Sequence, residues 1–296
     1  MRRTKYHKIK DIQKPDAILC ADLHLREDAP ICRVDDFQQA QWKKLMYIKT
    51  LQQQFDCPVL CSGDVFHHWK PSPYLLSKTI EHLPKNFYTV YGNHDMPQHN
   101  IELIQKSGIF TLEMAGSISI NILKGIQFLS YNMLPFTQND DNILIWHKMT
   151  YHKELPYPGC KESSAVQLLK KYPQFNLIVT GDNHKPFVVN YRGRLLVNPG
   201  SMTRQRASEA HKPRVYLWYA KTNSVEPIYL PCEENVISRE HIEIIEKRNK
   251  RIEAFIQSID NDVETTINFE ENLKRFEKKN NIRKTIMNII YKAIEK

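Results

Sequence analysis

The sequence predicts an α/β domain followed by a helical extension, and three observations lead to this prediction. From about residue 16 to residue 230, short apolar runs alternate with amphipathic segments of helical period. After Pro231 there is hardly a strand signal, and residues 236–296 contain neither Gly nor Pro and are rich in Glu, Lys, Arg and Ile. We therefore expect one domain at residues 1–232 and a helical C-terminal region, a candidate partner-binding segment, at residues 233–296.

The expected strands are short apolar runs bounded by turn residues, at 17–21, 58–61, 87–91, 126–131, 142–146 and 177–180. Two hairpins should follow. Residues 187–190 and 194–197 flank Arg192-Gly193, and residues 215–219 and 225–230 flank the turn at 222–224. Pro227 lacks a backbone N–H, so the last of these strands is expected at a sheet edge.

Helical patterns fill the gaps at residues 36–55, 73–83 and 163–172, the second of them behind a Ser72 N-cap. The C-terminal region reads as two or three helices. One of its apolar stripes runs through Ile244, Ile245, Ile252, Phe255 and Ile259. Such a stripe either packs within the protein or docks on a partner, and the pattern leaves both interpretations open.

Composition bounds the class of protein and its partners. A hydrophobic content of 41% with 25% charged residues is ordinary for a folded chain, so disorder is not expected. The formal net charge of +9 favours polyanionic partners. Much of the excess lies in the first fourteen residues, which form either a solvated tail or a DNA contact. Its basic members are Arg2, Arg3, Lys5, Lys8, Lys10 and Lys14.

Cysteine usage and hydropathy indicate the compartment. The six cysteines lack the dense spacing of a disulfide scaffold, and Cys57 and Cys61 have no second pair at the interval of a zinc site, so reduced thiols are expected. No apolar run approaches the roughly 20 residues that cross a bilayer. We expect a cytoplasmic protein without membrane contact.

Polar residues gather at the C-terminal ends of the predicted strands, which is where open α/β sheets place ligand sites. Any one of them alone is more often a helix cap or a satisfied polar residue, but five such sites in one order are hard to attribute to chance. The five sites are Asp22 and His24; Asp64; Asn93, His94 and Asp95; His147; and Asp182 and His184.

The residue types suit the hydrolysis of phosphate esters by two cations, which neutralise the phosphate and supply a nucleophile near neutral pH. Mixed Asp, Asn and His ligands favour manganese or iron over magnesium or structural zinc. Glycines precede Asp64, Asn93 and Asp182, where we expect tight turns that aim these side chains at the metals.

The order Asp-x-His, Gly-Asp, Gly-Asn-His-Asp, His, Gly-x-x-His resembles the calcineurin-like metallophosphoesterase superfamily over residues 16–201. The resemblance implies a four-layer α/β/β/α sandwich that binds two divalent metal ions, with manganese expected. Asp182 stands where the family usually has His, so a turn or N-cap carboxylate is its alternative role. The implied ligands are Asp22, His24, Asp64 and His184 for one metal, and Asp64, Asn93, His147 and Asp182 for the other.

Two short segments look like the SbcD-type nucleases of DNA double-strand-break repair. Gly63-Asp64-Val65-Phe66-His67, continuing to Lys70-Pro71-Ser72, is similar to one family segment, and Asn198-Pro199-Gly200-Ser201 to another. The departures are Ser62 in place of Gly, Asp182, and a short C-terminal part, which suggest a compact phage-encoded version. The resemblance implies DNA as substrate, exonuclease or endonuclease activity in repair or recombination, and an SbcC-type ATPase bound through the C-terminal helices. A homodimer is a further candidate assembly.

Roles carried over from that family are as follows. A metal-bound hydroxide attacks phosphorus in line, His94 acts as general acid, and Asp95 orients the His94 ring. His67 lies near the scissile phosphate. Ser201, Arg204 and Arg206 are candidate substrate contacts, with a solvated basic face as the alternative for the arginines. Tyr131 and Phe136 are expected to fill the core rather than stack on a base.

Two other classes of function remain. A small-molecule or protein phosphoesterase with the same metals would hydrolyse nucleotides or phosphoproteins and show no salt-sensitive binding of DNA. A non-catalytic scaffold would keep the fold and bind partners through its C-terminal helices, but the intact His94 and ligand positions argue against it.

Overall fold

The computed structural model describes residues 14–120, 123–136, 141–262 and 269–294. Most of the basic residues of the N-terminal segment, from Arg2 to Lys10, therefore lie outside the described residues. The chain divides into two compact units, Met1–Ser238 and Arg239–Lys296.

The first unit contains two β-sheets. The six-stranded sheet has the order β11-β10-β1-β2-β3-β4, and β1, β2, β3 and β4 run parallel to one another. Its strands are β1 Ala17–Cys20, β2 Val59–Cys61, β3 Phe87–Thr89, β4 Ser119–Ile120, β10 Arg214–Tyr219 and β11 Ser224–Tyr229. Strand β11 lies at the edge, as Pro227 predicts.

The five-stranded sheet has the order β5-β6-β7-β9-β8, with β8 antiparallel to its neighbour. Its strands are β5 Ile126–Leu129, β6 Ile143–Trp146, β7 Leu177–Thr180, β8 Phe187–Tyr191 and β9 Arg194–Asn198. Each expected strand is present within a residue or two of its predicted bounds.

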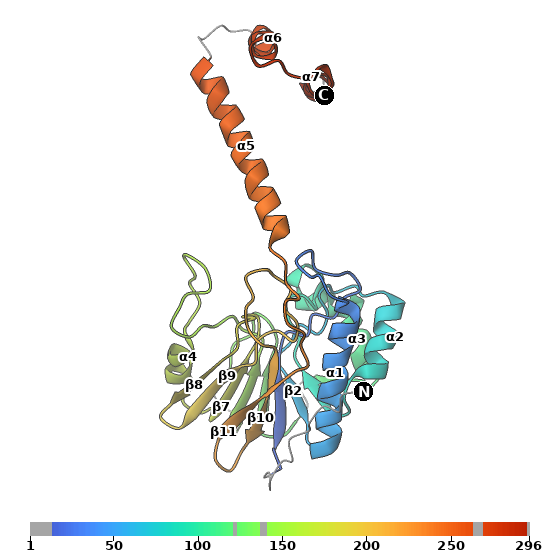
Figure 1. The fold of residues 1–296 in the computed structure, drawn as a ribbon. Helices are drawn as coiled ribbons and strands as arrows, with labels where there is room; N and C mark the ends of the chain where they lie inside the picture. Colours follow the sequence, from blue (N-terminus) through green and yellow to red (C-terminus); the bar gives the residue numbers. More distant parts are fainter. Residues whose placement is uncertain (1–13, 121–122, 137–140, 263–268, 295–296) are drawn as a thin grey trace. The chain divides into compact units, whose positions relative to one another are not determined.

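Helices cover the outer face of each sheet (Figure 1). Helices α1 (Phe37–Phe55), α2 (Pro73–His82) and α3 (Gly108–Met114) pack on the six-stranded sheet, in a cluster that includes Ile48, Leu75 and Ile109. Helix α4 (Ala165–Lys171) packs on the other sheet through Leu168 and Leu169. Together with the cluster between the sheets, these contacts confirm the predicted α/β/β/α sandwich.

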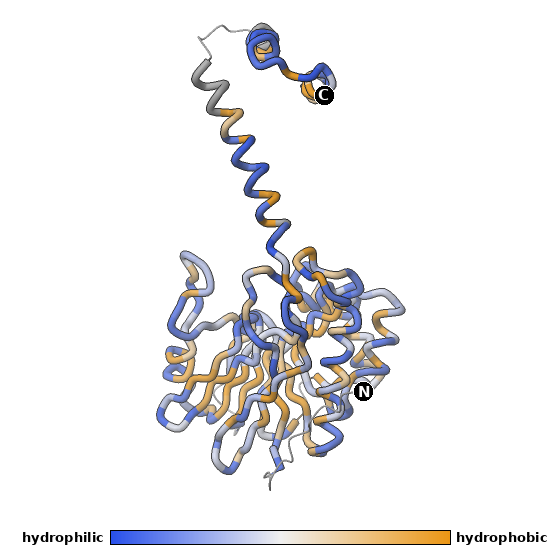
Figure 2. The backbone as a smooth tube through the Cα atoms, viewed as in Figure 1, coloured by the Kyte–Doolittle hydropathy of each residue, from blue (hydrophilic) through white to orange (hydrophobic). Residues whose placement is uncertain are grey.

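Alternate residues of a strand supply two of these clusters. Ile18 and Cys20 face the helices, whereas Ala17 and Leu19 face the second sheet. Strands that are buried on both faces read as continuous apolar runs, which is why they are recognisable in the sequence. Figure 2 shows the apolar residues concentrated in the strands of this unit and the hydrophilic residues in its outer loops.

Side chains cap the helices of the first unit. Asp36 accepts a hydrogen bond from the Gln39 amide, Ser72 caps α2, and Ser164 forms a reciprocal capping box with Gln167. The sequence did not predict α3, β4 or the two 3₁₀ helices Pro97–His99 and Ile101–Lys106. These elements are short and lack a sustained apolar period, so only their packing against the sheet identifies them.

The second unit consists of three helices, α5 (Glu240–Asp262), α6 (Phe269–Asn280) and α7 (Lys284–Ile294). The rings of Phe255 and Phe276 meet edge to face at 5.2 Å, which joins α5 to α6. Ile244, Ile245 and Ile252 are exposed on α5, while the Ile259 side chain lies outside the described residues. None of the helices described here is long and apolar enough to cross a membrane.

Candidate metal centre

The candidate ligands lie where the sequence predicts, directly beyond the carboxyl ends of parallel strands. Asp22 and His24 follow β1, Asp64 follows β2, and His147 follows β6, and all four side chains are buried. Hydrogen bonds between the loops bring the two sheets together at this edge. The Asp182 amide, beyond β7, donates to Asp22 Oδ1 over 3.0 Å, and His147 Nδ1 donates to the Ser62 carbonyl over 2.7 Å.

Four candidate site residues of these loops have a left-handed backbone conformation. Asp22, His24, Asp64 and Asp182 all adopt positive φ angles, of 49°, 45°, 53° and 71°. Each such residue costs about 1–3 kcal/mol and persists only where the surrounding structure enforces it. The fold therefore holds these side chains in place against a local conformational preference, as functional sites often do.

The glycines of the three loops serve two different purposes, which corrects the expectation of three tight turns. Only Gly63, with φ of 97°, adopts a turn that favours glycine. At Gly92 a Cβ atom would lie 2.0 Å from Asp64 Oδ1, and at Gly181 it would lie 2.7 Å from the Ser62 carbonyl oxygen. Those two glycines allow neighbouring loops to approach closely.

Hydrogen-bond acceptors converge on one side of Asp64. Because His147 Nδ1 donates to a backbone carbonyl, the neutral ring carries its lone pair on Nε2. That nitrogen lies 2.8 Å from Asn93 Oδ1 and 3.6 Å from Asp64 Oδ2. Three acceptor atoms facing one another repel unless a cation lies between them, so this group fits a divalent metal.

A second group of candidate ligand atoms approaches the same oxygen of Asp64. His184 Nδ1 donates to Glu209 Oε1 over 2.6 Å, and its Nε2 lies 3.0 Å from His24 Nε2. His24 Nε2 is in turn 3.5 Å from Asp64 Oδ2. Potential ligand atoms of Asp22, His24 and Asp64 all lie within 4.8 Å of one another.

Burial makes the negative charge of these carboxylates costly unless a positive charge lies beside them. Burial raises the pKa of Asp22, and burial together with the charges of Asp95 and Asp22 raises the pKa of Asp64 well above its usual value. Within the described part of the chain, Asp22 Oδ2 is buried without a hydrogen-bond partner. A buried carboxylate oxygen without a donor is costly, and a bound cation would satisfy it.

Asp182 lies at the edge of both groups. Its charge raises the pKa of Asp22 and of Asp64, so it lies near both carboxylates. It does not cap a helix, because the element that follows it in the described stretch 141–262 is strand β8. The contact that fixes Asp182 is made by its backbone amide, which donates to Asp22 Oδ1.

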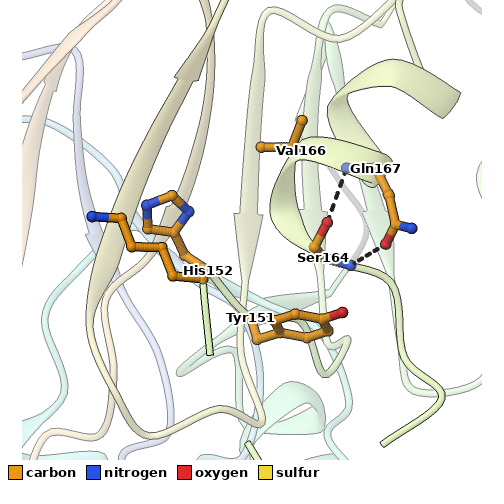
Figure 3. A pocket seen from close by; sticks show the side chains of 6 residues that line it. Tyr151, His152, Ser164, Val166 and Gln167 are labelled. Atoms are coloured by element: carbon orange, nitrogen blue, oxygen red, sulfur yellow. Dashed lines mark hydrogen bonds between the residues drawn. The ribbon is translucent and has the colours of Figure 1, made fainter. Parts of the chain in front are cut away.

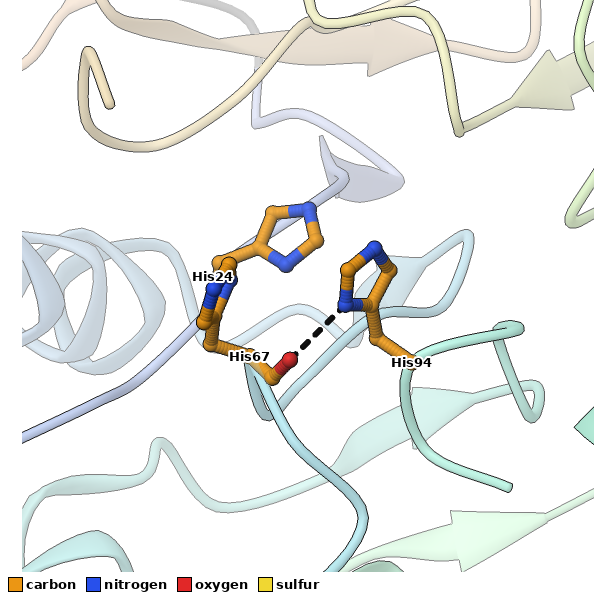
Figure 4. A group of neighbouring side chains, drawn as sticks. All are labelled: His24, His67 and His94. Atoms are coloured by element: carbon orange, nitrogen blue, oxygen red, sulfur yellow. Dashed lines mark hydrogen bonds between the residues drawn. The ribbon is translucent and has the colours of Figure 1, made fainter. Parts of the chain in front are cut away.

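His67 and His94 complete a cluster with His24, in which the three rings approach one another (Figure 4). The ring of His24 lies 4.7 Å from that of His94 and 5.5 Å from that of His67. His94 Nδ1 donates to the His67 carbonyl oxygen over 2.7 Å, which directs Nε2 away from the loop. Burial, with the charges of Arg26 and His94, lowers the pKa of His67 to about 4.

Asp95 does not orient the His94 ring, contrary to expectation. Its carboxylate instead accepts hydrogen bonds from the backbone amides of Val65, Phe66 and Gly92, at 3.2, 3.0 and 3.0 Å. Asp95 therefore ties together the loops that carry Asp64 and Asn93. The group that orients His94 is the His67 backbone carbonyl, which no side-chain pattern reveals.

The three predicted substrate contacts differ in their surroundings. The Ser201 hydroxyl is fully buried and donates to the Thr203 carbonyl over 2.9 Å, so it does not face a substrate. Arg204 Nη2 lies 3.5 Å from Cys232 Sγ, which places its guanidinium against a different part of the surface. Arg206 is exposed, and its charge acts on His184, so this side chain lies beside the centre.

Sequence reasoning missed the residues that support the centre. Glu209 is buried and holds His184, and it also accepts from the amides of Gln205 and Arg206. The Gln205 carboxamide in turn donates to the His24 carbonyl and accepts from Arg26 Nη1. Carboxylates that orient metal-binding histidines in this way are common, but Glu209 lies in an irregular loop where no spacing marks it.

Two aromatic residues, Tyr131 and Phe136, were expected in the core. Tyr131 is half-buried against the helical side of the sheet, and its ring lies 6.2 Å from that of His147. Phe136 is 57% exposed, so the core interpretation is wrong for that residue. The Gln127 side chain holds its backbone. The carboxamide of Gln127 donates to the Phe136 carbonyl and accepts from the Phe136 amide.

Comparison with known proteins places the chain in a family. Similar solved structures include a novel archaeal phosphodiesterase (13% identity, TM-score 0.41, covering 72% of this chain and 99% of that one). Others are the protein TT1561 of Thermus thermophilus (11%, 0.44, 74% and 100%) and Vacuolar Protein Sorting 29 from Cryptosporidium parvum (18%, 0.35, 74% and 100%). No curated protein matches the chain. The model of the calcineurin-like phosphoesterase superfamily domain matches residues 17–220, and the chain therefore belongs to that superfamily.

Proposed function

We propose that the chain is a DNA phosphodiesterase, an SbcD-type nuclease subunit that works with two divalent cations, with manganese as the metal. The observation that carries this proposal is the position of His67. It belongs to the nuclease-like segment that begins at Gly63-Asp64, and its ring lies 5.3 Å from that of His94 and 5.5 Å from that of His24. The segment that distinguishes the nucleases from other phosphoesterases thus takes part in the site itself.

The residues fit two cations that share Asp64. Asp22, His24, Asp64 and His184 would hold one, and Asp64, Asn93, His147 and Asp182 the other. When bound, two such cations neutralise a phosphate and lower the pKa of a water molecule, so that a nucleophile forms near neutral pH. The nitrogen and oxygen ligands favour a borderline ion such as manganese over magnesium, which prefers oxygen alone.

His94 is the group that we assign as general acid. Its Nδ1–H is occupied by the His67 carbonyl, so a proton on Nε2 is the one available to a leaving oxygen. The ring is half-buried and the backbone amide of His94 donates to Asp64 Oδ1 over 3.0 Å, which fixes it beside the bridging carboxylate. His67 would position the phosphate on the same side.

Arginine side chains at the rim support a polyanionic substrate. Arg206 is exposed beside His184, and Arg26, directly after the Asp22-Leu23-His24 loop, is close enough to affect His67. Guanidinium groups match the geometry of phosphate oxygens. Arg206 would contact a phosphate that flanks the reacting one, whereas the Arg26 guanidinium is already paired with Asp28 and Gln205.

The C-terminal helices are the proposed site for an SbcC-type ATPase. Ile244, Ile245 and Ile252 expose about half of their surface along α5, at 58%, 52% and 46%. An amphipathic helix of this kind binds a groove on a partner through such anchors. Basic residues between them, such as Lys247 and Arg248, would affect the association rate more than the affinity.

A cleavage assay distinguishes the proposed function from its alternatives. Labelled single-stranded and duplex DNA should be degraded with manganese and left intact with EDTA. Hydrolysis of nucleotides or phosphoproteins without any cleavage of DNA would favour the small-molecule or protein phosphoesterase. A protein that binds manganese and hydrolyses none of these substrates would be a scaffold.

A further inference from the structure

A pocket of about 440 Å³ opens between the loop that follows β6 and the start of α4. Six residues line it, namely Tyr151, His152, Lys153, Ser164, Val166 and Gln167 (Figure 3). Its volume falls within the range of about 300–1,000 Å³ that is usual for ligand sites. None of its residues is a candidate ligand or catalytic group of the metal centre.

The chain and its hydrogen bonds tie this pocket to the metal centre. Tyr151 comes four residues after His147, so their Cα atoms are at most about 14 Å apart. Asn183, which lies between Asp182 and His184, donates from Nδ2 to the Thr150 carbonyl over 2.7 Å. This upper bound of about 14 Å corresponds to at most about four nucleotides at 3.4 Å each along one strand of duplex DNA. A strand held at the metals can therefore place a nearby nucleotide in the pocket.

The aromatic side chains of the pocket suit a flat ring. Tyr151 and His152 are both half-buried, so part of each ring faces the open space. His152 is backed by Phe187, with ring centroids 6.3 Å apart and an interplanar angle of 34°. Val166 adds an apolar surface. Rings that are held in place by the protein stack on nucleobases with little loss of entropy.

The polar side chains of the pocket suit the rest of a nucleotide. The Gln167 carboxamide oxygen accepts from the Ser164 amide over 2.7 Å, which leaves its NH₂ group as a donor for a base edge. Lys153 is an exposed cation that can meet a phosphate. Of the described residues that line the pocket, none is acidic, so nothing in the lining repels a polyanion.

We propose that this pocket binds a nucleobase of the DNA strand within about four nucleotides of the scissile phosphate. The inference rests on the proposed nuclease function, which it deepens by adding a subsite beside the metals. Tyr151 supplies the stacking ring, Gln167 contacts the base edge, and Lys153 contacts the phosphate of the same nucleotide. The enzyme would then bind a strand partly through a base that is not itself at the point of cleavage.

The test compares Tyr151→Ala with Tyr151→Phe, which keeps the ring, and with Tyr229→Ala, which removes an exposed tyrosine from the edge strand β11. The substrates are a short single-stranded oligonucleotide, in which phosphorothioate linkages leave one cleavable phosphodiester, and bis(p-nitrophenyl) phosphate, which has no base. Loss of one stacked base should lower the ratio of kcat/KM for DNA to kcat/KM for the aryl diester by about 5- to 150-fold. Tyr151→Phe and Tyr229→Ala should keep the wild-type ratio.

Abasic oligonucleotides locate the subsite. One abasic position within four nucleotides of the cleavable bond should lower wild-type kcat/KM about as much as Tyr151→Ala does, and the variant should lose nothing further at that position. If Tyr151→Ala does not fold, Lys153→Ala should lower the same ratio and reduce the salt slope of DNA binding by about one.

The outcomes separate the subsite from the nuclease function. If the wild type cleaves DNA but Tyr151→Ala and Lys153→Ala keep the wild-type ratio of kcat/KM values, the subsite is overturned and the nuclease function stands. The same conclusion follows if the loss caused by the abasic position and the loss caused by Tyr151→Ala multiply when the two are combined. A wild-type enzyme that hydrolyses the aryl diester but no DNA overturns the proposed function, and the subsite with it.

Discussion

Replacing Glu209 by Gln should weaken manganese binding although Glu209 is not a candidate ligand. One carboxylate oxygen accepts from His184 Nδ1, and the other accepts from the amides of Gln205 and Arg206. A Gln side chain has only one acceptor oxygen. If that oxygen keeps the backbone amides, its NH₂ group faces His184 Nδ1–H, and the ring must move its proton to Nε2 to avoid two facing donors. That proton would occupy the nitrogen that faces His24 Nε2 and that would otherwise bind a cation.

The expected loss follows from this geometry. Removing an outer partner of a metal-binding histidine typically weakens metal affinity by about 10- to 100-fold. This corresponds to about 1.4–2.7 kcal/mol, which matches the value of a hydrogen bond to a charged group, about 1.5–3 kcal/mol. Isothermal titration with Mn²⁺ measures the effect. The matched control is Glu113→Gln, because the Tyr91 hydroxyl donates to Glu113 over 2.6 Å, the Gln oxygen can still accept this bond, and neither residue is a candidate ligand. Wild-type Mn²⁺ affinity in Glu209→Gln would show that this contact does not orient a ligand.

Three further predictions concern the acid, the close approach of loops and the helical unit. His94→Asn should keep its manganese yet lower turnover on DNA by about 10²–10⁴, with a much smaller loss on an aryl diester; equal losses on the two substrates would remove His94 from the acid role. Gly92→Ala should lose manganese and about 1–3 kcal/mol of unfolding free energy, because the new Cβ would lie 2.0 Å from Asp64 Oδ1. Gly116→Ala, whose Cβ meets nothing within 4 Å, should keep its manganese, and equal metal loss in both variants would argue against the clash. Deleting residues 239–296 should abolish ATPase binding but spare manganese-dependent cleavage of short single-stranded DNA, and an unfolded or metal-free truncation would contradict this.

Much of the fold can be predicted from the sequence because the strands are buried on both faces. Runs such as Ile143 to Trp146 stand out as apolar segments whatever surrounds them, and the turn residues on either side give their ends. The segment from Met96 to Ile120 behaves differently. Its 3₁₀ turns, short helix and two-residue strand depend on contacts with α2 and β3 rather than on a period of their own.

The position of the candidate site can be predicted from the sequence for a related reason. Parallel strands bring their carboxyl ends to one edge, so polar residues that follow each strand must meet there. The contacts that hold those residues could not be predicted from spacing. Asp95 binds backbone amides, His94 binds a backbone carbonyl, and Glu209 reaches His184 from an irregular loop. Contacts with backbone groups leave no pattern in the sequence. For this reason the predictions that Asp95 orients His94 and that Ser201 contacts the substrate are wrong.

The central claim is that two cations share the Asp64 carboxylate and act on a phosphodiester. Equilibrium dialysis with elemental analysis counts the manganese bound per chain, and the same samples can be assayed on labelled single-stranded DNA. The wild-type chain should bind two manganese ions and cleave the DNA, whereas Asp64→Ala and the isosteric Asp64→Asn should lose metal and cleavage together. An Asp64→Ala protein that keeps two manganese ions and the wild-type rate would contradict the account.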